Sequence, residues 1–142
     1  MPDDVLPSPF SLEGLAQRYP LIMRYARDPA SMSPFDFDGV ACEAGWASLI
    51  FPVLDAVETE IGKKKQEGAP EADWPQVEQV KQKFGELRIY VNHVSPAILE
   101  LIVAAVARSR ETCAVCGNPG TRRVLGGWQL ATVCDEHAKE KE

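Results

Sequence analysis

The sequence predicts an α+β fold, with helices packed on a small β element and a short separate module at the C-terminus. Apolar residues recur at helical spacing over residues 50–61, whereas polar and apolar residues alternate over 86–91. The last part of the chain contains two Cys/His pairs, each with the spacing of metal ligands. We therefore expect a flexible arm at residues 1–10, an α+β core at 11–110, and a module at 111–142 packed on that core.

Composition limits the class of protein. The chain has 142 residues, 45% of them hydrophobic, and a formal net charge of −6. This apolar content is sufficient for a folded core and argues against wholesale disorder. No apolar run approaches the roughly 20 residues that a membrane span needs, and no charged-then-apolar leader opens the chain. We expect a protein without membrane partners.

The first half of the core is predicted to be helical, with one long loop. Ser11 is suited to an N-cap, and Pro20 is expected to bend or divide the helix that follows. Residues 28–39 are predicted to form a loop. A second helix is expected from Gly45 to the lysines at 63–65, which suit a helix C-terminus. Its buried face repeats at intervals of four, three and four residues: Ile50, Leu54, Val57 and Ile61.

The second half of the core is predicted to contain a strand and a helix after a polar linker at residues 66–75. Alternation predicts a strand over 87–92, and the stretch before Gly85 is either a pairing strand or a short helix. Ser95-Pro96 opens a helix over 97–108, which is apolar almost all round and is therefore expected at the centre of the core. One core should combine these elements through Ile50, Leu54, Leu87, Ile89, Ile98, Leu101 and Ile102.

The strongest motif is the pair Cys113-Ala-Val-Cys116 and Cys134-Asp-Glu-His137. Zn²⁺ prefers four such ligands in a tetrahedron, and a disulfide or a redox C-x2-C would leave His137 unexplained. Four protein ligands close the coordination shell, so the ion is expected to be structural rather than catalytic. Thiols committed to metal indicate a reducing, cytoplasmic compartment. The remaining thiol, Cys42, is expected to be a buried small hydrophobe.

The segment between the two pairs indicates the kind of metal module. Gly117 to Gly120 forms a tight turn sequence, and two β-prone runs flank Gly126-Gly127, which predicts a hairpin. Cys134 then opens a helix-favouring stretch with acidic residues early. A knuckle, a hairpin and a helix that holds the last two ligands resemble a treble-clef zinc finger over residues 111–140. That resemblance implies a fold and not a role.

A second resemblance extends over residues 40–140. The segments that carry it are Gly45-Trp46, the stretch QVKQKFGELRIY at 79–90, CAVCGNPG at 113–120, Gly127-Trp128 and Cys134–His137. They are similar to a family of small, largely uncharacterised bacterial and phage proteins with the pattern K-x-K-F-G-x-L-R-F-Y, C-x2-C-G-x-P-G, G-W and C-x2-H. The chain departs from the pattern at Ile89, where an aromatic residue is usual, and at residues 42–45. The resemblance implies a setting among toxin–immunity and mobile-element genes.

Charge distribution favours a non-enzymatic protein-binding module, such as an immunity or inhibitor protein that neutralises a basic toxin. Residues 1–60 contain ten acidic and three basic side chains. Such a surface speeds association with a basic partner and helps to select it. The candidate partner-binding residues are Asp36, Asp38, Glu43, Asp55 and Glu58.

Two alternatives remain open at the level of sequence. The first is a nucleic-acid-binding or regulatory zinc-finger protein, in which cationic side chains contact phosphates and a tryptophan stacks on a base. Its candidate residues are Arg108, Arg110, Arg122, Arg123 and Trp128, although arginines near a zinc–thiolate centre also serve to balance its negative charge. The second is an enzyme, but His93 has no second histidine to work with, so we expect no catalytic residues.

Overall fold

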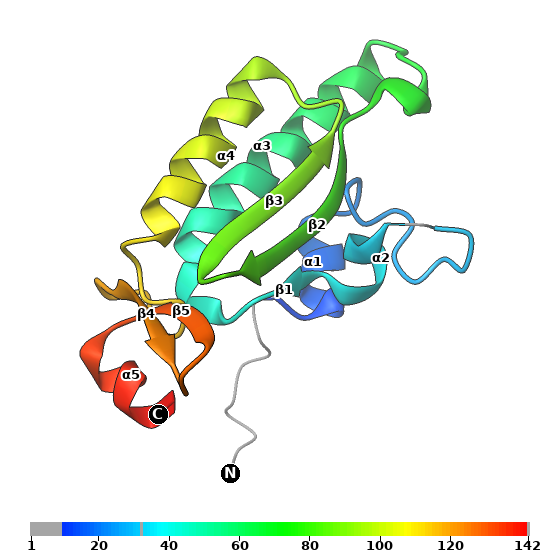
Figure 1. The fold of residues 1–142 in the computed structure, drawn as a ribbon. Coiled ribbons are helices and arrows are strands. Elements are labelled where there is room, and N and C mark those ends of the chain that lie inside the picture. Colours follow the sequence, from blue (N-terminus) through cyan, green and yellow to red (C-terminus); the bar gives the residue numbers. More distant parts are fainter. Residues whose placement is uncertain (1–9, 32, 142) are drawn as a thin grey trace.

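The computed structural model describes residues 10–31 and 33–141 and contains both helices and strands (Figure 1). It confirms the α+β prediction. The helices are α1 (Leu12–Arg18), α2 (Pro34–Asp38), α3 (Ala47–Gln66), α4 (Pro96–Ser109) and α5 (Asp135–Lys141), with short 3₁₀ helices η2 (Ala44–Trp46) and η3 (Glu71–Asp73). The strands are β1 (Val40–Ala41), β2 (Gln76–Lys83), β3 (Glu86–Asn92), β4 (Thr121–Leu125) and β5 (Gln129–Val133).

The larger sheet has the strand order β1-β2-β3, with β1 parallel to β2 and β2 antiparallel to β3. The stretch before Gly85, for which the sequence left two alternatives, is therefore a pairing strand. Val80 lies opposite Ile89, and a bulge between Val77 and Gln79 shifts the register. Because of this extra residue, Val77 and Val80 are both fully buried although they are three positions apart.

The central element of the core is α3. In Figure 1, α3 and α4 lie against the same face of the sheet, behind β3. The predicted stripe of four apolar residues on α3 is fully buried. On its other side, the Tyr19 hydroxyl donates to Asp55 Oδ1 at 2.7 Å, and the Glu58 carboxylate accepts from two backbone N–H groups at 2.9 and 3.0 Å. Tertiary contacts thus surround α3.

The prediction that the helix at 97–108 is central is wrong. Ile98 and Ile102 on α4 are buried, but Leu99, Leu101 and Val103 are 49%, 40% and 60% exposed. Only one side of α4 packs against α3 and β3, so its remaining apolar side chains face solvent. Leu101 consequently does not belong to the core, whereas the other six residues predicted with it are buried.

Several boundaries also differ from the sequence-based prediction. The predicted loop at 28–39 contains the short helix α2, and α3 continues past Gly62 to Gln66. The predicted polar linker contains η3. Phe10, expected in the arm, is buried and packs against Phe51 in a tilted arrangement, with ring centroids 5.6 Å apart. The rest of the predicted arm, residues 1–9, lies outside the described residues.

Replacing Leu54 by alanine should lower the free energy of unfolding by about 2–5 kcal/mol, because this leucine is fully buried on α3. Leu101→Ala is the matched control, since it removes the same atoms from a helical side chain that is 40% exposed. We expect the control to cost less than about 1 kcal/mol. Urea denaturation of both variants provides the measurement, and equal costs would contradict this assignment of the core.

Candidate metal centre

Four side chains from the C-terminal part of the chain converge on one point. The ligand atoms of Cys113, Cys116, Cys134 and His137 all lie within 4.8 Å of one another. Cys113 Sγ is 3.6 Å and Cys134 Sγ is 3.2 Å from His137 Nδ1, and Cys116 Sγ is 3.9 Å from Cys134 Sγ. These residues form a metal site of the Cys₃His type.

The spacing of the ligand atoms fits a tetrahedral ion. Bond lengths of about 2.3 Å to sulfur and 2.0–2.1 Å to nitrogen imply about 3.8 Å between two sulfurs and about 3.6 Å between sulfur and nitrogen. The observed separations of 3.9, 3.6 and 3.2 Å lie close to these values. A disulfide needs about 2.05 Å between sulfurs, so Cys116 and Cys134 are not bonded to each other.

The first two ligands sit in a tight turn that follows α4. The Gly117 N–H donates to the carbonyl of Cys113 at 2.9 Å, and the Cys113 N–H donates to the carbonyl of Asn118 at 2.7 Å. Gly117 has φ +83°, a conformation that glycine adopts without steric cost. The turn therefore places both sulfurs on the same side, where one ion can bind them.

The other two ligands follow the hairpin formed by β4 and β5. Cys134 directly follows β5, and its carbonyl accepts from the Ala138 N–H at 2.9 Å, so His137 lies in the first turn of α5. Arg123 on β4 joins these parts, because it donates to the Val133 carbonyl and to Asp135 Oδ1 at 3.3 and 2.7 Å. The hairpin and the helix that were predicted from sequence are both present.

The turn that contains Cys113 and Cys116, called the metal turn below, is hydrogen-bonded to the core at η2. The Gly45 N–H donates to the Ala114 carbonyl at 2.9 Å, and Trp46 Nε1 donates to the Thr112 carbonyl at 2.8 Å. A Cβ on Gly45 would lie 2.4 Å from the Cys113 carbonyl oxygen. Only glycine lets the two backbones approach this closely.

A second joint connects the hairpin to the turn between β2 and β3. Thr132 Oγ1 donates to the Gly85 carbonyl at 2.6 Å, and the Ala114 N–H donates to the Thr132 carbonyl at 2.9 Å. A Cβ on Gly85 would meet the Ala131 backbone at 3.1 Å. Two separated backbone contacts thus hold the metal module in a fixed orientation on the core.

The local environment shifts the pKa values of two thiols in opposite directions. Burial raises the pKa of Cys113, but backbone N–H groups of Cys116, Cys134 and Val115 outweigh burial and lower it to about 6. A thiol that ionises this readily is suited to metal binding, because the thiolate is the ligand. In contrast, burial raises the pKa of Cys42 to about 12, so this thiol stays protonated and inert near neutral pH.

The acidic candidates do not form one exposed face. Asp36 is 1% exposed and accepts a hydrogen bond from the Ser31 hydroxyl, so it does not lie on the surface. Asp55 pairs with Arg18 and Tyr19, and Glu58 binds the backbone of the segment after α1. Asp38 and Glu43 are exposed. Most of the predicted acidic set therefore serves internal contacts.

The arginine candidates separate into three groups. Arg123 belongs to the metal module, where it contacts Asp135, and Arg108 lines a groove between α3 and α4. Arg110 Nε donates to Glu86 Oε2 at 2.5 Å, and Arg122 Nε donates to the Phe84 carbonyl at 2.8 Å. The structure therefore brings only Arg110 and Arg122 to the same region, where β2, β3 and β4 meet.

Trp128 lies at the turn between β4 and β5 and is 83% exposed. Val124, on the same hairpin, is 59% exposed. Packing on the core does not cover this end of the hairpin, so a large aromatic side chain faces solvent.

No sequence pattern indicated the role of Glu86. This carboxylate is 8% exposed and is paired with Arg110 and with Arg88 Nη1 at 2.8 Å. The hydrogen bond from Arg110 lowers the pKa of Glu86, and the nearby charges of Arg88 and Arg122 lower it further. Two guanidinium groups, from β3 and from the end of α4, thus pair with one carboxylate, and sequence spacing could not reveal the contact with Arg110.

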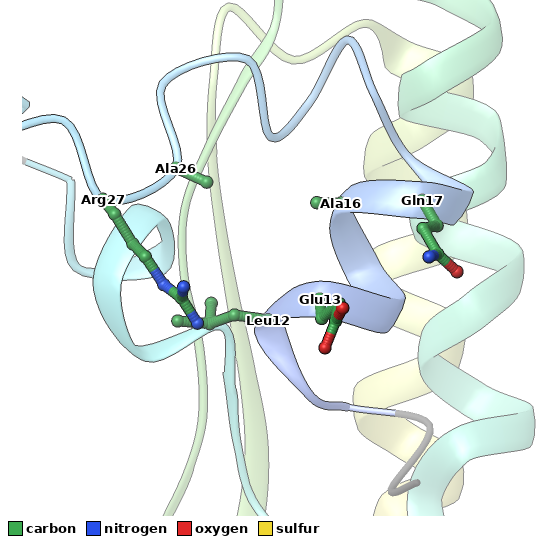
Figure 2. Close-up of a pocket in the computed structure, with 6 residues that line it drawn as sticks. All are labelled: Leu12, Glu13, Ala16, Gln17, Ala26 and Arg27. Atoms are coloured by element: carbon green, nitrogen blue, oxygen red, sulfur yellow. The ribbon is translucent and has the colours of Figure 1, made fainter.

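A surface groove lies apart from the metal centre, between α1 and the segment at 26–27 (Figure 2). Its lining residues are Leu12, Glu13, Ala16, Gln17, Ala26 and Arg27. Leu12, Ala16 and Ala26 also pack against the main core, so the groove has an apolar floor. None of the predicted site residues lines it.

Comparisons with protein-family models, with curated proteins and with solved structures find no match to this chain. Within the described residues, none of the helices has the length and apolar character needed to cross a membrane.

The double variant Cys116→Ala with Cys134→Ala should lose the bound metal, because it removes two of four ligands. Elemental analysis of the purified protein measures the effect. The variant should also lose protection of the β4–β5 hairpin from hydrogen exchange, since metal binding and folding free energy are shared in small metal modules. Cys42→Ala is the control and should keep one ion per chain. Full metal occupancy in the double variant would contradict the site.

Gly45→Ala should destabilise the junction between the core and the metal turn, because the new methyl group would overlap the Cys113 carbonyl. We expect a loss of more than about 1 kcal/mol in unfolding free energy and faster metal release to a chelator.

Gly62→Ala on α3 is the matched control. The nearest atom to its added methyl group is a Leu21 side-chain carbon at 3.8 Å. Alanine also favours a helix by up to about 1 kcal/mol over glycine. Unchanged metal release from the Gly45 variant would contradict the proposed constraint.

Proposed function

We propose that the protein is a non-enzymatic nucleic-acid-binding module whose C-terminal part is held by structural Zn²⁺. The observation that carries this proposal is the pairing of Glu86 with Arg88 and Arg110, together with Arg122, which is hydrogen-bonded to the Phe84 carbonyl two residues before Glu86. These residues come from three different elements, and they create a cationic surface on an acidic protein.

The donor set supports zinc as the ion. Three cysteine sulfurs and one histidine nitrogen are the usual ligands of structural Zn²⁺, and four protein ligands leave no position for a substrate. The buried apolar residues of the metal module are few: Cys113, Leu125, Val133 and Ala138. Such a small core does not hold a chain segment by itself, so the ion supplies a large part of the folding free energy of the module.

The charges around Glu86 favour an anionic ligand. One carboxylate balances one of the three guanidinium groups, which leaves an excess of positive charge where β3, β4 and the end of α4 meet. The net charge of −6 does not cancel this excess, because screening limits electrostatic influence to about 8 Å at physiological salt. A phosphate group that approaches this surface therefore meets a locally positive potential.

The hairpin adds an aromatic contact. Trp128 is 83% exposed, and Arg122 lies on the strand before it. Stacking of a base on an exposed aromatic ring contributes about 1–3 kcal/mol and tolerates any base. An exposed tryptophan at the tip of the hairpin that carries Arg122 offers a stacking surface, which suits a nucleic acid better than a basic protein.

A second candidate function is binding of a basic protein partner, such as a toxin, by an immunity-type protein. Asp38 and Glu43 favour it, because both are exposed and they flank β1 on its two sides. Three of the five acidic candidates are buried or engaged inside the molecule, so the surface left for such a partner is small. We therefore place this candidate second.

The test is fluorescence anisotropy with labelled DNA and RNA oligonucleotides. Wild-type protein should bind, and its affinity should fall steeply between about 50 and 200 mM salt, because phosphate contacts release counterions. Arg122→Ala should weaken binding and reduce the salt slope by about 1. Trp128→Ala should weaken binding by about 1–3 kcal/mol.

Arg108→Ala is the matched control, since this arginine lies in the groove between α3 and α4. It should leave the affinity unchanged, and all variants should retain their metal. Absence of binding by wild-type protein at low salt would refute the proposal. In that case, loss of a basic protein partner on charge reversal at Asp38 and Glu43 would support the second candidate.

A further inference from the structure

We propose that the outer face of the β2–β3 pair is a binding platform for single-stranded nucleic acid. This inference rests on the proposed function and names the class of nucleic acid and the surface that receives it. The platform consists of five residues of the two strands and the turn between them, namely Lys81, Lys83, Phe84, Arg88 and Tyr90.

The strand register places the four strand residues of the platform on one face, and Phe84 lies in the turn that follows Lys83. Lys81 lies opposite Arg88, Gln79 opposite Tyr90, and Lys83 opposite Glu86. The alternate residues Val80, Leu87 and Ile89 are buried against the helices. Because side chains alternate across a strand, the platform residues point to the opposite side.

This face of the sheet is open to solvent. In Figure 1, α3 and α4 lie behind β3, and the face of β2 and β3 toward the viewer is uncovered. Phe84 is 58% exposed and Tyr90 is 46% exposed. Exposure of two aromatic rings to water is unfavourable in the free protein, and a ligand that covers them would remove this cost.

The charges on the platform are not arranged for stability of the free protein. Lys81 and Arg88 form a directly opposed pair of like charge, which destabilises an antiparallel sheet. Arg88 also contacts Glu86, which Arg110 engages as well. Lys81 and Lys83 therefore extend the cationic cluster around Glu86 along the C-terminal end of β2. An anion bound across the two strands would relieve this repulsion.

The aromatic residues indicate a single strand rather than a duplex. Tyr90 lies towards the far end of β3, and Phe84 lies at the turn, next to the hairpin residue Arg122. Lys83 Nζ is 5.5 Å from the centre of the Phe84 ring, so a charge and a stacking surface are combined there. Unpaired bases can stack on such rings while the lysines contact the phosphates, whereas the bases of a duplex are already stacked on each other.

The platform is continuous with the metal module. Arg122 on β4 donates to the Phe84 carbonyl, and Thr132 on β5 donates to the Gly85 carbonyl. The hairpin that makes these contacts carries the exposed Trp128 at its other end, so a strand that extends past the β2–β3 turn would meet a further stacking surface there.

The experiment compares a labelled single-stranded oligothymidine with a duplex of the same length, using full-length metal-loaded protein. We expect the single strand to bind more tightly than the duplex. Tyr90→Ala should weaken single-strand binding roughly 5- to 150-fold, and Tyr90→Phe should restore it. Lys81→Glu should weaken binding further and lower its salt dependence, and Lys81→Arg should retain it. Metal content and circular dichroism should stay unchanged in all four variants.

Three outcomes would overturn the inference. The first is equal or tighter binding of the duplex, and the second is unchanged affinity in both Tyr90→Ala and Lys81→Glu. The third is equally effective competition by polyglutamate, which would show that the face binds acidic polypeptides through charge alone. If Arg122→Ala and Trp128→Ala still weaken binding in these cases, the proposed function stands without the platform. If the wild-type protein binds no nucleic acid, both proposals fail together.

Discussion

The close approach of two backbones at Gly45 is the contact on which the rest of the arrangement depends. This glycine lies in η2, the short helix that directly precedes α3, and its N–H donates to the carbonyl of Ala114 in the metal turn. The added Cβ of any other residue would lie 2.4 Å from the Cys113 carbonyl oxygen. The start of the central helix and the first metal ligand are therefore positioned by the same contact. Trp46, fully buried and hydrogen-bonded to Thr112, fixes the angle between them.

This constraint links metal binding to the stability of the core. The buried apolar cluster of the metal module consists of only four residues, but its turn is bonded to η2 and its hairpin to the turn between β2 and β3. Distortion at either joint would displace the ligands, and loss of the ion would release both joints. We therefore infer that a bound metal orients the hairpin on the sheet, in addition to stabilising the module itself.

The surface charge is organised by the same joints. Arg88 and Arg110 pair with Glu86 directly, whereas Arg122 contributes to its environment because β4 is held beside the β2–β3 turn. Among the described acidic candidates, Asp36 is buried and Glu58 binds backbone N–H groups, so these two residues do not contribute to an exposed acidic cluster. Net charge is thus a poor guide to the surface that a ligand would meet, and the local arrangement of a few paired groups is a better one.

The sequence by itself determined the features that depend on local spacing. The four ligands of the metal site, the glycine-flanked hairpin, the N-cap at Ser11 and the buried stripe of α3 all follow from patterns within a few residues, because ligand geometry, turn conformation and helical periodicity act at that range. The tertiary structure decided which apolar faces are covered and which charges meet. Leu101 has the same character as Leu54, but α4 packs on one side only and leaves it exposed. The roles of Gly45 and Glu86 likewise depend on contacts between segments distant in sequence, which no local pattern specifies.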